Sequence, residues 1–214
     1  MKEIELIIFD LDGTLVNSQY DLGDAVNFAL FKLAKPQLAH EEIPSMLGGG
    51  IRKLISLALE STEKEKIEEA FGFFKTYYES NYANKTICYP EVEATIKKLA
   101  HKKKAIYSNK AHRFTQGIIS KLGLSNEFEM IQGAIPDKYA LKPSPEGLNY
   151  ILNELNVLPQ HALMVGDSTH DIEAAHLAGM KACAVTYGYR SKEILLKKRP
   201  EAIIDRMGEL LDFF

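Results

Sequence analysis

From about residue 86 onward, short apolar runs alternate with amphipathic segments, and this alternation constrains the fold more than any other feature. The apolar runs have the length of strands and the amphipathic segments that of helices. The expected strands are Ala105–Tyr107, Phe128–Ile131, Ala162–Val165, Ala182–Thr186 and Ile203–Ile204. The expected helices are Glu91–His101, Arg113–Leu122, Pro145–Leu155 and Asp171–Ala178, with a short one at the end of the chain. Strands that alternate with helices predict a doubly wound α/β fold around a parallel sheet.

An all-helical block interrupts this pattern near the start of the sequence. The apolar run Ile4–Phe9 predicts a first buried strand, but residues 20–82 contain no strand candidate. Apolar residues recur there with the period of a helix over Leu22–Leu33, Ile51–Leu59 and Thr62–Tyr82. We therefore predict a catalytic core domain formed by residues 1–16 and 86–214, and an inserted all-helical cap domain formed by residues 17–85.

Composition argues against several classes of protein. The 214 residues are 46% hydrophobic and 26% charged with a net charge of −3, so no basic excess indicates nucleic acid or anionic membrane as a partner. Two cysteines without a CxxC motif favour a reduced, cytoplasmic protein. We see neither a signal peptide nor an apolar run of the roughly 20 residues that a membrane span needs. The expected partner is a small molecule, and the expected state is a monomer or homodimer.

Two carboxylates, two residues apart, follow the first expected strand. Asp10 and Asp12 lie where this strand gives way to a turn that contains Gly13. On an extended chain such residues point the same way, and at about 4 Å their charges repel by roughly 4 kcal/mol in a surface-like dielectric. A bound cation would relieve this repulsion, so the pair indicates chemistry.

Simpler interpretations of the pair are a turn and a calcium-binding loop. Asp12-Gly13 alone is compatible with an ordinary turn. A calcium-binding loop is excluded, because aligning Gly13 with the glycine of such a loop puts Ile8 and Gln19 at the first and last ligand positions.

Further polar residues follow three other expected strands. They are Ser108 and Asn109, then Lys142, then Asp167 and Ser168, with Asp171 at the start of the next helix. Ligands of open parallel sheets bind beyond the carboxyl ends of the strands, so these side chains should meet at one edge. Carboxylates are the ligands that Mg²⁺ prefers, and a lysine suits a phosphate oxygen. The pattern predicts a metal-and-phosphate site with Mg²⁺ as cofactor.

At these positions the chain resembles the haloacid dehalogenase (HAD) superfamily of phosphatases over nearly its whole length. The first motif of that family, Asp-x-Asp-Gly-Thr, is matched by residues 10–14. The later motifs are matched in order by Ser108, Lys142 and the pair Asp167 and Asp171. The resemblance implies a HAD-like Rossmannoid core with a cap, and hydrolysis of a phosphate ester through an aspartyl-phosphate intermediate.

The resemblance also implies roles for single residues. Asp10 is the expected nucleophile and Asp12 the expected general acid and base. Lys142 and Ser108, with Asn109 as a further neutral donor, are expected to hold the phosphoryl oxygens. The expected metal ligands are Asp10, Asp167 and the backbone carbonyl of Asp12. Asp171, with Ser168 beside it, is expected to position Lys142 or a water on the metal. Direct ligation of the metal by Asp171 is an alternative, and a charge placed for the helix dipole is the simpler interpretation.

The expected substrate depends on the cap. Residues 17–27 and the Gly48–Gly50 turn resemble the phosphoglycolate phosphatase group, as does Ser108-Asn109-Lys110. The turn is either a flexible joint or a backbone-amide cradle, in which Gly49 and Arg52 contact the non-phosphoryl end of a small anionic substrate such as 2-phosphoglycolate.

Other enzymatic functions are compatible with the same expected site residues. They are a pyrophosphatase, a sugar-phosphate phosphatase and a β-phosphoglucomutase, although Tyr20 lies near the position where mutases carry a histidine. A non-enzymatic phospho-accepting switch belongs to a different class. It would be about half as long and would lack the helical insertion.

Overall fold

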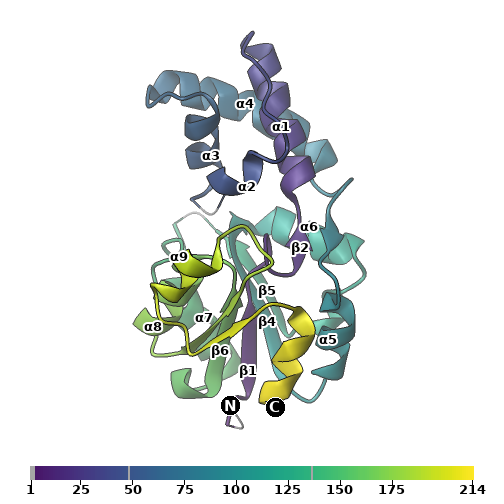
Figure 1. Ribbon diagram of the computed structural model, residues 1–214, viewed down its shortest axis with the longest axis vertical. Coiled ribbons are helices and arrows are strands. Elements are labelled where there is room, and N and C mark those ends of the chain that lie inside the picture. Colours follow the sequence, from purple (N-terminus) through teal and green to yellow (C-terminus); the bar gives the residue numbers. More distant parts are fainter. Residues whose placement is uncertain (1–2, 48, 136) are drawn as a thin grey trace. The chain divides into compact units, whose positions relative to one another are not determined.

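A six-stranded parallel sheet organises the larger part of the chain (Figure 1). The computed structural model describes residues 3–47, 49–135 and 137–214. It divides the chain into two units, a core unit of residues 1–17 and 88–214 and a cap unit of residues 18–87. The functional assignment of these units as catalytic core and cap stays a prediction.

The sheet has the strand order β5-β4-β1-β6-β7-β8. The strands are β1 (Leu6–Phe9), β4 (Lys103–Ala111), β5 (Met130–Ala134), β6 (Ala162–Gly166), β7 (Lys181–Val185) and β8 (Ala202–Ile204). Every neighbouring pair is parallel. The predicted doubly wound α/β fold is confirmed.

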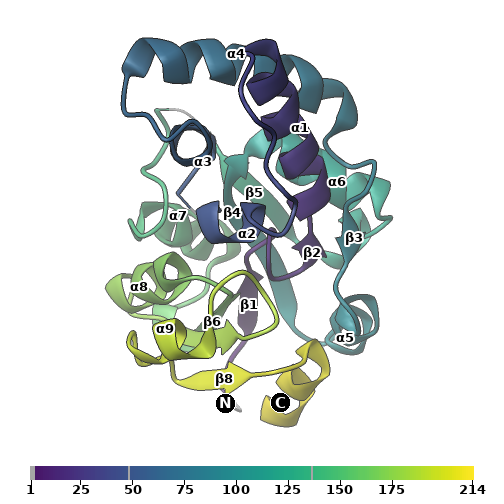
Figure 2. The same ribbon diagram turned by 45° about the horizontal axis from the view of Figure 1, so that its top comes forward.

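Helices cover both faces of this sheet. They are α5 (Val92–Lys98), α6 (His112–Lys121), α7 (Glu146–Leu155), α8 (Thr169–Leu177) and α9 (Lys192–Leu196), with short 3₁₀ segments at Ser125–Glu127, Pro159–His161 and Met207–Phe213. Figures 1 and 2 show α5 and α6 on one side of the sheet and α7 and α8 on the other. Strands β1 and β6 are therefore buried on both faces, which explains their continuous apolar sequence.

Two predicted strands differ most in their bounds from the strands in the structure. The strand expected at Ala105–Tyr107 runs from Lys103 to Ala111, because its polar ends also join the ladder. The strand expected at Phe128–Ile131 begins only at Met130. Phe128 is buried for another reason: its ring packs edge-on against Phe9, with the centroids 6.3 Å apart. Phe128 is thus buried without belonging to a strand, and an apolar pattern cannot distinguish these two cases.

The cap unit is helical. Its helices are α1 (Gln19–Lys32), α2 (Ile43–Met46), α3 (Ile51–Ala58) and α4 (Lys64–Asn81). The long helices α1 and α4 pack together, with the rings of Phe28 and Tyr77 5.1 Å apart. At the two crossings of the chain, β2 (Val16–Asn17) and β3 (Ile87–Cys88) pair as a small two-stranded sheet.

A buried carboxylate joins the two ends of the cap unit. Asp21, in the first turn of α1, is 1% exposed. It accepts hydrogen bonds from the backbone of Lys85 (3.0 Å to each oxygen) and of Thr86 (2.8 Å), and from the Thr86 hydroxyl (2.6 Å). Charge-assisted hydrogen bonds of this kind are among the stronger ones in proteins, so Asp21 holds the returning chain against α1.

We expect the substitution Asp21→Ala to lower the free energy of unfolding by about 3 kcal/mol, because it leaves buried backbone N–H groups without an acceptor. Urea denaturation followed by circular dichroism measures this loss. Asp24→Ala is the matched control, since Asp24 lies one turn away and pairs with Lys85 and His40 near the surface. It should cost less than about 1 kcal/mol. Equal losses for the two variants would contradict the role of Asp21.

Candidate active site

The register of the sheet brings three strand ends to one edge. Phe9 pairs with Ile106 of β4 on one side and with Val165 of β6 on the other. Asp10 directly follows Phe9, and Asp167 lies two residues after Val165, so the two carboxylates leave the sheet from neighbouring strands. Ser108 lies on β4 at the same level and is 2% exposed.

Lys142 connects these strand ends. Its side chain is 2% exposed, and its Nζ lies 2.9 Å from Asp10 Oδ1 and 2.7 Å from Asp171 Oδ1. The same Nζ donates to the backbone carbonyl of Tyr107 at 3.0 Å. Burial by itself would lower the pKa of Lys142, but the charges of Asp10 and Asp171 outweigh it and raise the pKa. The ammonium group thus stays charged between two carboxylates.

Asp171 is held in place by the start of α8. Its Oδ2 accepts hydrogen bonds from the Ser168 backbone N–H (3.0 Å) and from the Ser168 hydroxyl (2.7 Å). The Asp171 N–H donates in return to Ser168 Oγ at 3.4 Å, which completes a capping box. Gly166 permits this approach, since a Cβ there would lie 2.3 Å from the Asp171 carboxyl carbon. Both oxygens of Asp171 therefore have hydrogen-bond donors. The predicted pairing of Asp171 with Lys142 is present in the geometry, and the functional role stays a prediction.

Asn109 brackets the backbone of Lys142. Its Nδ2 donates to the Lys142 carbonyl oxygen at 3.0 Å, and its Oδ1 accepts from the Lys142 N–H at 2.8 Å. Sequence reasoning assigned this amide to a phosphate oxygen, a contact that stays a prediction. What the structure shows is a two-point clamp that fixes the loop from which Lys142 extends.

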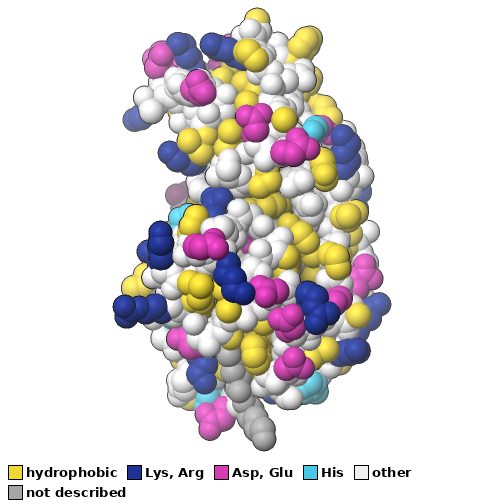
Figure 3. All heavy atoms as spheres, viewed as in Figure 1, with side chains coloured by type: hydrophobic (Ala, Val, Ile, Leu, Met, Phe, Trp, Pro, Cys, Tyr) yellow, Lys and Arg dark blue, Asp and Glu magenta, His cyan; other side chains and the backbone are white. Residues whose placement is uncertain are grey.

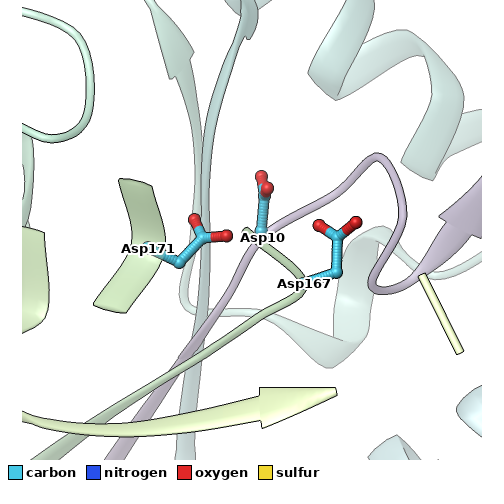
Figure 4. A group of neighbouring side chains, drawn as sticks. All are labelled: Asp10, Asp167 and Asp171. Atoms are coloured by element: carbon cyan, nitrogen blue, oxygen red, sulfur yellow. The ribbon is translucent and has the colours of Figure 1, made fainter. Parts of the chain in front are cut away.

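Three carboxylates form a buried acidic group at this edge. Ligand atoms of Asp10, Asp167 and Asp171 all lie within 4.8 Å of one another (Figure 4). Burial raises the pKa of Asp10 to about 7, with Lys142 opposing the rise and Asp171 adding to it. Burial likewise raises the pKa of Asp167 well above its usual range, and the charges of Asp171 and Asp10 raise it further.

Within the part of the chain that the structure describes, the acidic group carries more negative charge than the neighbouring Lys142 can compensate. Three carboxylates face the single ammonium of Lys142, so two negative charges are left uncompensated when all three acids are ionised. Asp10 Oδ1 also accepts from the Leu11 N–H (2.7 Å), and Asp167 Oδ2 from the Tyr189 N–H (2.7 Å). Among the described residues, Asp10 Oδ2 and Asp167 Oδ1 accept no hydrogen bond. A hard divalent cation fits two such oxygens in both charge and ligand chemistry.

Gly13 lets the loop after β1 approach Asp167. Its φ is +84°, and a Cβ there would lie 2.2 Å from Asp167 Oδ2. The Asp12-Gly13 pair therefore does more than make a turn, since only glycine fits beside this carboxylate.

Asp12 lies apart from the acidic group. Its carboxylate pairs with Lys110, whose Nζ is 3.0 Å from Oδ1 and 2.9 Å from Oδ2. Sequence reasoning placed neither Lys110 nor Tyr189 at the site. The signal for Lys110 was the Ser108-Asn109-Lys110 resemblance, which named this lysine without giving it a role. No local signal marks Tyr189, because its contact with Asp167 is made by the backbone N–H.

Arg52 and Gly49, the two cap residues predicted to contact the substrate, lie against other residues of the cap unit. Arg52 forms a two-point ion pair with Glu68 (2.5 and 2.9 Å), and its guanidinium stacks on the ring of Phe71 at 4.1 Å. A Cβ at Gly49 would lie 3.0 Å from the Lys53 side chain. Contact of Arg52 and Gly49 with a substrate stays a prediction, and Gly48 lies outside the described residues.

On the face in Figure 3, basic and acidic side chains are interspersed. Across residues 3–47, 49–135 and 137–214, no helix is both long enough and apolar enough to cross a bilayer.

Comparison with known proteins identifies the family. The sequence profile of the haloacid dehalogenase-like hydrolases matches residues 7–185. The phosphoglycolate phosphatase of Haemophilus influenzae (strain 86-028NP) is 35% identical over 224 residues, which cover 98% of this chain and 97% of that protein. That of Pasteurella multocida is 33% identical, with 99% and 98% covered. The crystal structure of a predicted phosphoglycolate phosphatase from Haemophilus somnus superposes with a TM-score of 0.90 at 30% identity, covering 100% and 99% of the two chains. Profile, relatives and fold agree, and the chain belongs to the haloacid dehalogenase-like hydrolase family.

Proposed function

We propose that this protein is a Mg²⁺-dependent phosphatase that hydrolyses a small anionic phosphomonoester, 2-phosphoglycolate, through an aspartyl-phosphate on Asp10. One observation carries the proposal: a buried carboxylate, Asp10, is held by Lys142 beside an acidic group with two uncompensated charges. The family and the names of relatives that are about 35% identical over nearly the whole chain support the same activity.

Asp10 and Asp167 are the residues that would hold the metal, through the two oxygens that accept no hydrogen bond from described residues. The backbone carbonyl of Asp12 is the proposed third ligand. When bound, Mg²⁺ would supply positive charge that balances the acidic group and stabilises the charge of a phosphoryl group in the transition state.

The protein's own side chains provide the covalent chemistry. Asp10 Oδ attacks phosphorus and forms a P–O bond as the bond to the leaving oxygen breaks. Asp12 gives a proton to that oxygen, and later accepts one from the water that attacks the aspartyl-phosphate, which restores the Asp10 carboxylate. Lys142 and Ser108 stabilise the phosphoryl oxygens, and Asp171 and Asn109 keep Lys142 in position.

Magnitudes show why several groups are needed. Hydrolysis of phosphate monoesters can require about 10²¹-fold acceleration, whereas a single general acid or base contributes roughly 10²–10⁴-fold. Most of the acceleration must therefore come from fixed charges and from the positioning of the reacting atoms. A buried, hydrogen-bonded set of charges is suited to this task, because its dipoles and charges need little reorganisation during the reaction.

We expect Asp10→Asn to abolish turnover of an aryl phosphate while the protein stays folded, because an amide is a poor nucleophile and the change removes one repelling charge. Steady-state assays with Mg²⁺ measure turnover, and thermal unfolding checks the fold. A folded Asp10→Asn variant that keeps Mg²⁺-dependent turnover would show that the nucleophile is another residue.

Mg²⁺ should raise the melting temperature of the wild-type protein, because it relieves repulsion among the buried carboxylates. The gain is about 2.7 kcal/mol when Mg²⁺ is present at 100 times its Kd. Asp167→Asn should reduce the shift strongly, whereas Asp205→Asn, which changes a surface carboxylate paired with Lys192, should leave it intact. A wild-type protein whose melting temperature does not respond to Mg²⁺, with EDTA-treated protein as reference, would contradict the metal assignment.

A substrate panel tests the finer proposal. We expect 2-phosphoglycolate to give the highest kcat/KM among 2-phosphoglycolate, pyrophosphate, sugar phosphates and nucleotides. Arg52→Ala should raise KM for 2-phosphoglycolate about tenfold, which corresponds to about 1.4 kcal/mol of lost binding. Glu68→Ala is the control, since it removes the partner of Arg52 and leaves the guanidinium in place. An unchanged KM in Arg52→Ala for every anionic substrate would contradict the contact, and a preference for pyrophosphate would favour a pyrophosphatase.

A further inference from the structure

Each carboxylate of the Asp10-Leu11-Asp12 stretch has its own buried lysine. Lys142 contacts Asp10, whereas Lys110 contacts both oxygens of Asp12, at 3.0 and 2.9 Å. The Lys110 side chain is 4% exposed and that of Asp12 is 20% exposed. Burying an ammonium group costs several kcal/mol unless a partner compensates it, and the Asp12 carboxylate is such a partner for Lys110.

The backbone around Lys110 is fixed from several sides. Its N–H donates to the Ser108 hydroxyl oxygen at 3.2 Å, and its carbonyl accepts from the Thr115 hydroxyl at 3.3 Å. Gly133 on β5 approaches the same carbonyl so closely that a Cβ there would lie 2.5 Å away. The ammonium group of Lys110 therefore extends from a backbone that is hydrogen-bonded and closely packed, which suits it to hold another side chain in one orientation.

We propose that Lys110 is a positioning residue for the acid–base step, an inference that rests on the proposed function. Lys110 holds the Asp12 carboxyl group in one orientation through contacts to both of its oxygens. When Asp12 gives its proton to the leaving oxygen and the P–O bond breaks, both carboxyl oxygens of Asp12 stay within hydrogen-bond distance of Lys110 Nζ. Lys110 thus acts through the orientation of Asp12, and it touches neither phosphorus nor the leaving group.

This role predicts a dependence on the leaving group. A poor leaving group such as phenolate needs its proton as the bond breaks, whereas dinitrophenolate departs without one. Loss of Lys110 should therefore slow the reaction of phenyl phosphate and spare that of dinitrophenyl phosphate. A residue needed only for folding would change both rates by the same factor.

The experiment measures release of the phenol in the first turnover, with enzyme in excess and Mg²⁺ present, so that later hydrolysis of the intermediate does not contribute. We expect Lys110→Met to slow phenyl phosphate about 100-fold and dinitrophenyl phosphate less than about threefold. Asp12→Asn should show the same pattern. In the double variant Asp12→Asn/Lys110→Met the second change should cost nothing more, because Lys110 acts through Asp12.

The double variant also guards against misfolding. Lys110→Met leaves a carboxylate without its buried partner, and Asp12→Asn removes that unpaired charge, so the double variant should fold even if the single one is unstable. Lys104→Met is the matched control. Lys104 is an equally buried lysine on the same strand, and its Nζ donates to the Leu99 carbonyl at 3.2 Å. It should lower the melting temperature without changing the dependence on the leaving group.

Three results would overturn the inference. Equal slowing of both substrates in Lys110→Met would make Lys110 a structural residue. A further loss in the double variant would show that Lys110 acts other than through Asp12. Absence of Mg²⁺-dependent phenol release by the wild-type protein would overturn the proposed function and this inference with it, which distinguishes that failure from the other two.

Discussion

The geometry of the site depends on one buried ammonium group. Lys142 lies between Asp10 and Asp171, and a third carboxylate, Asp167, completes the acidic group. Without this ammonium the strand ends would carry several like charges in a low-dielectric setting, where repulsion is far stronger than in water. The Asn109 clamp and the capping box at Ser168 hold Lys142 and Asp171 in place, so much of the surrounding polar network serves one charge contact.

The same network leaves an excess of negative charge at the acidic group when all three carboxylates are ionised. One ammonium for three carboxylates creates a place where a divalent cation is electrostatically favoured, and the oxygens without hydrogen bonds from described residues belong to Asp10 and Asp167. The carboxylate of Asp12 does not add to this excess, because it pairs with a different lysine, Lys110. Two carboxylates that lie two residues apart in the sequence thus have separate environments.

Much of the fold could be predicted from pattern, and the misses have physical causes. The apolar runs located β1 and β6 well, since both are buried on two faces. Strand β4 was predicted too short, because Lys104 and Lys110 are buried yet polar, and a hydrophobic pattern cannot detect them. The start of β5 was predicted too early, because Phe128 is buried by packing against Phe9 before the strand begins.

The sequence by itself determined the fold class through its periodicity and the family through the resemblance of its motifs. It also located most of the acidic and basic residues at the strand ends, with Lys110 as the exception. Only the tertiary structure decided the pairings: Lys142 with Asp10, Lys110 with Asp12, Asn109 with the backbone of Lys142, and the Tyr189 N–H with Asp167. The physical reason is that spacing along a strand sets the direction of a side chain, whereas its partner depends on sheet register and on the path of distant loops. Those are products of packing over the whole core unit.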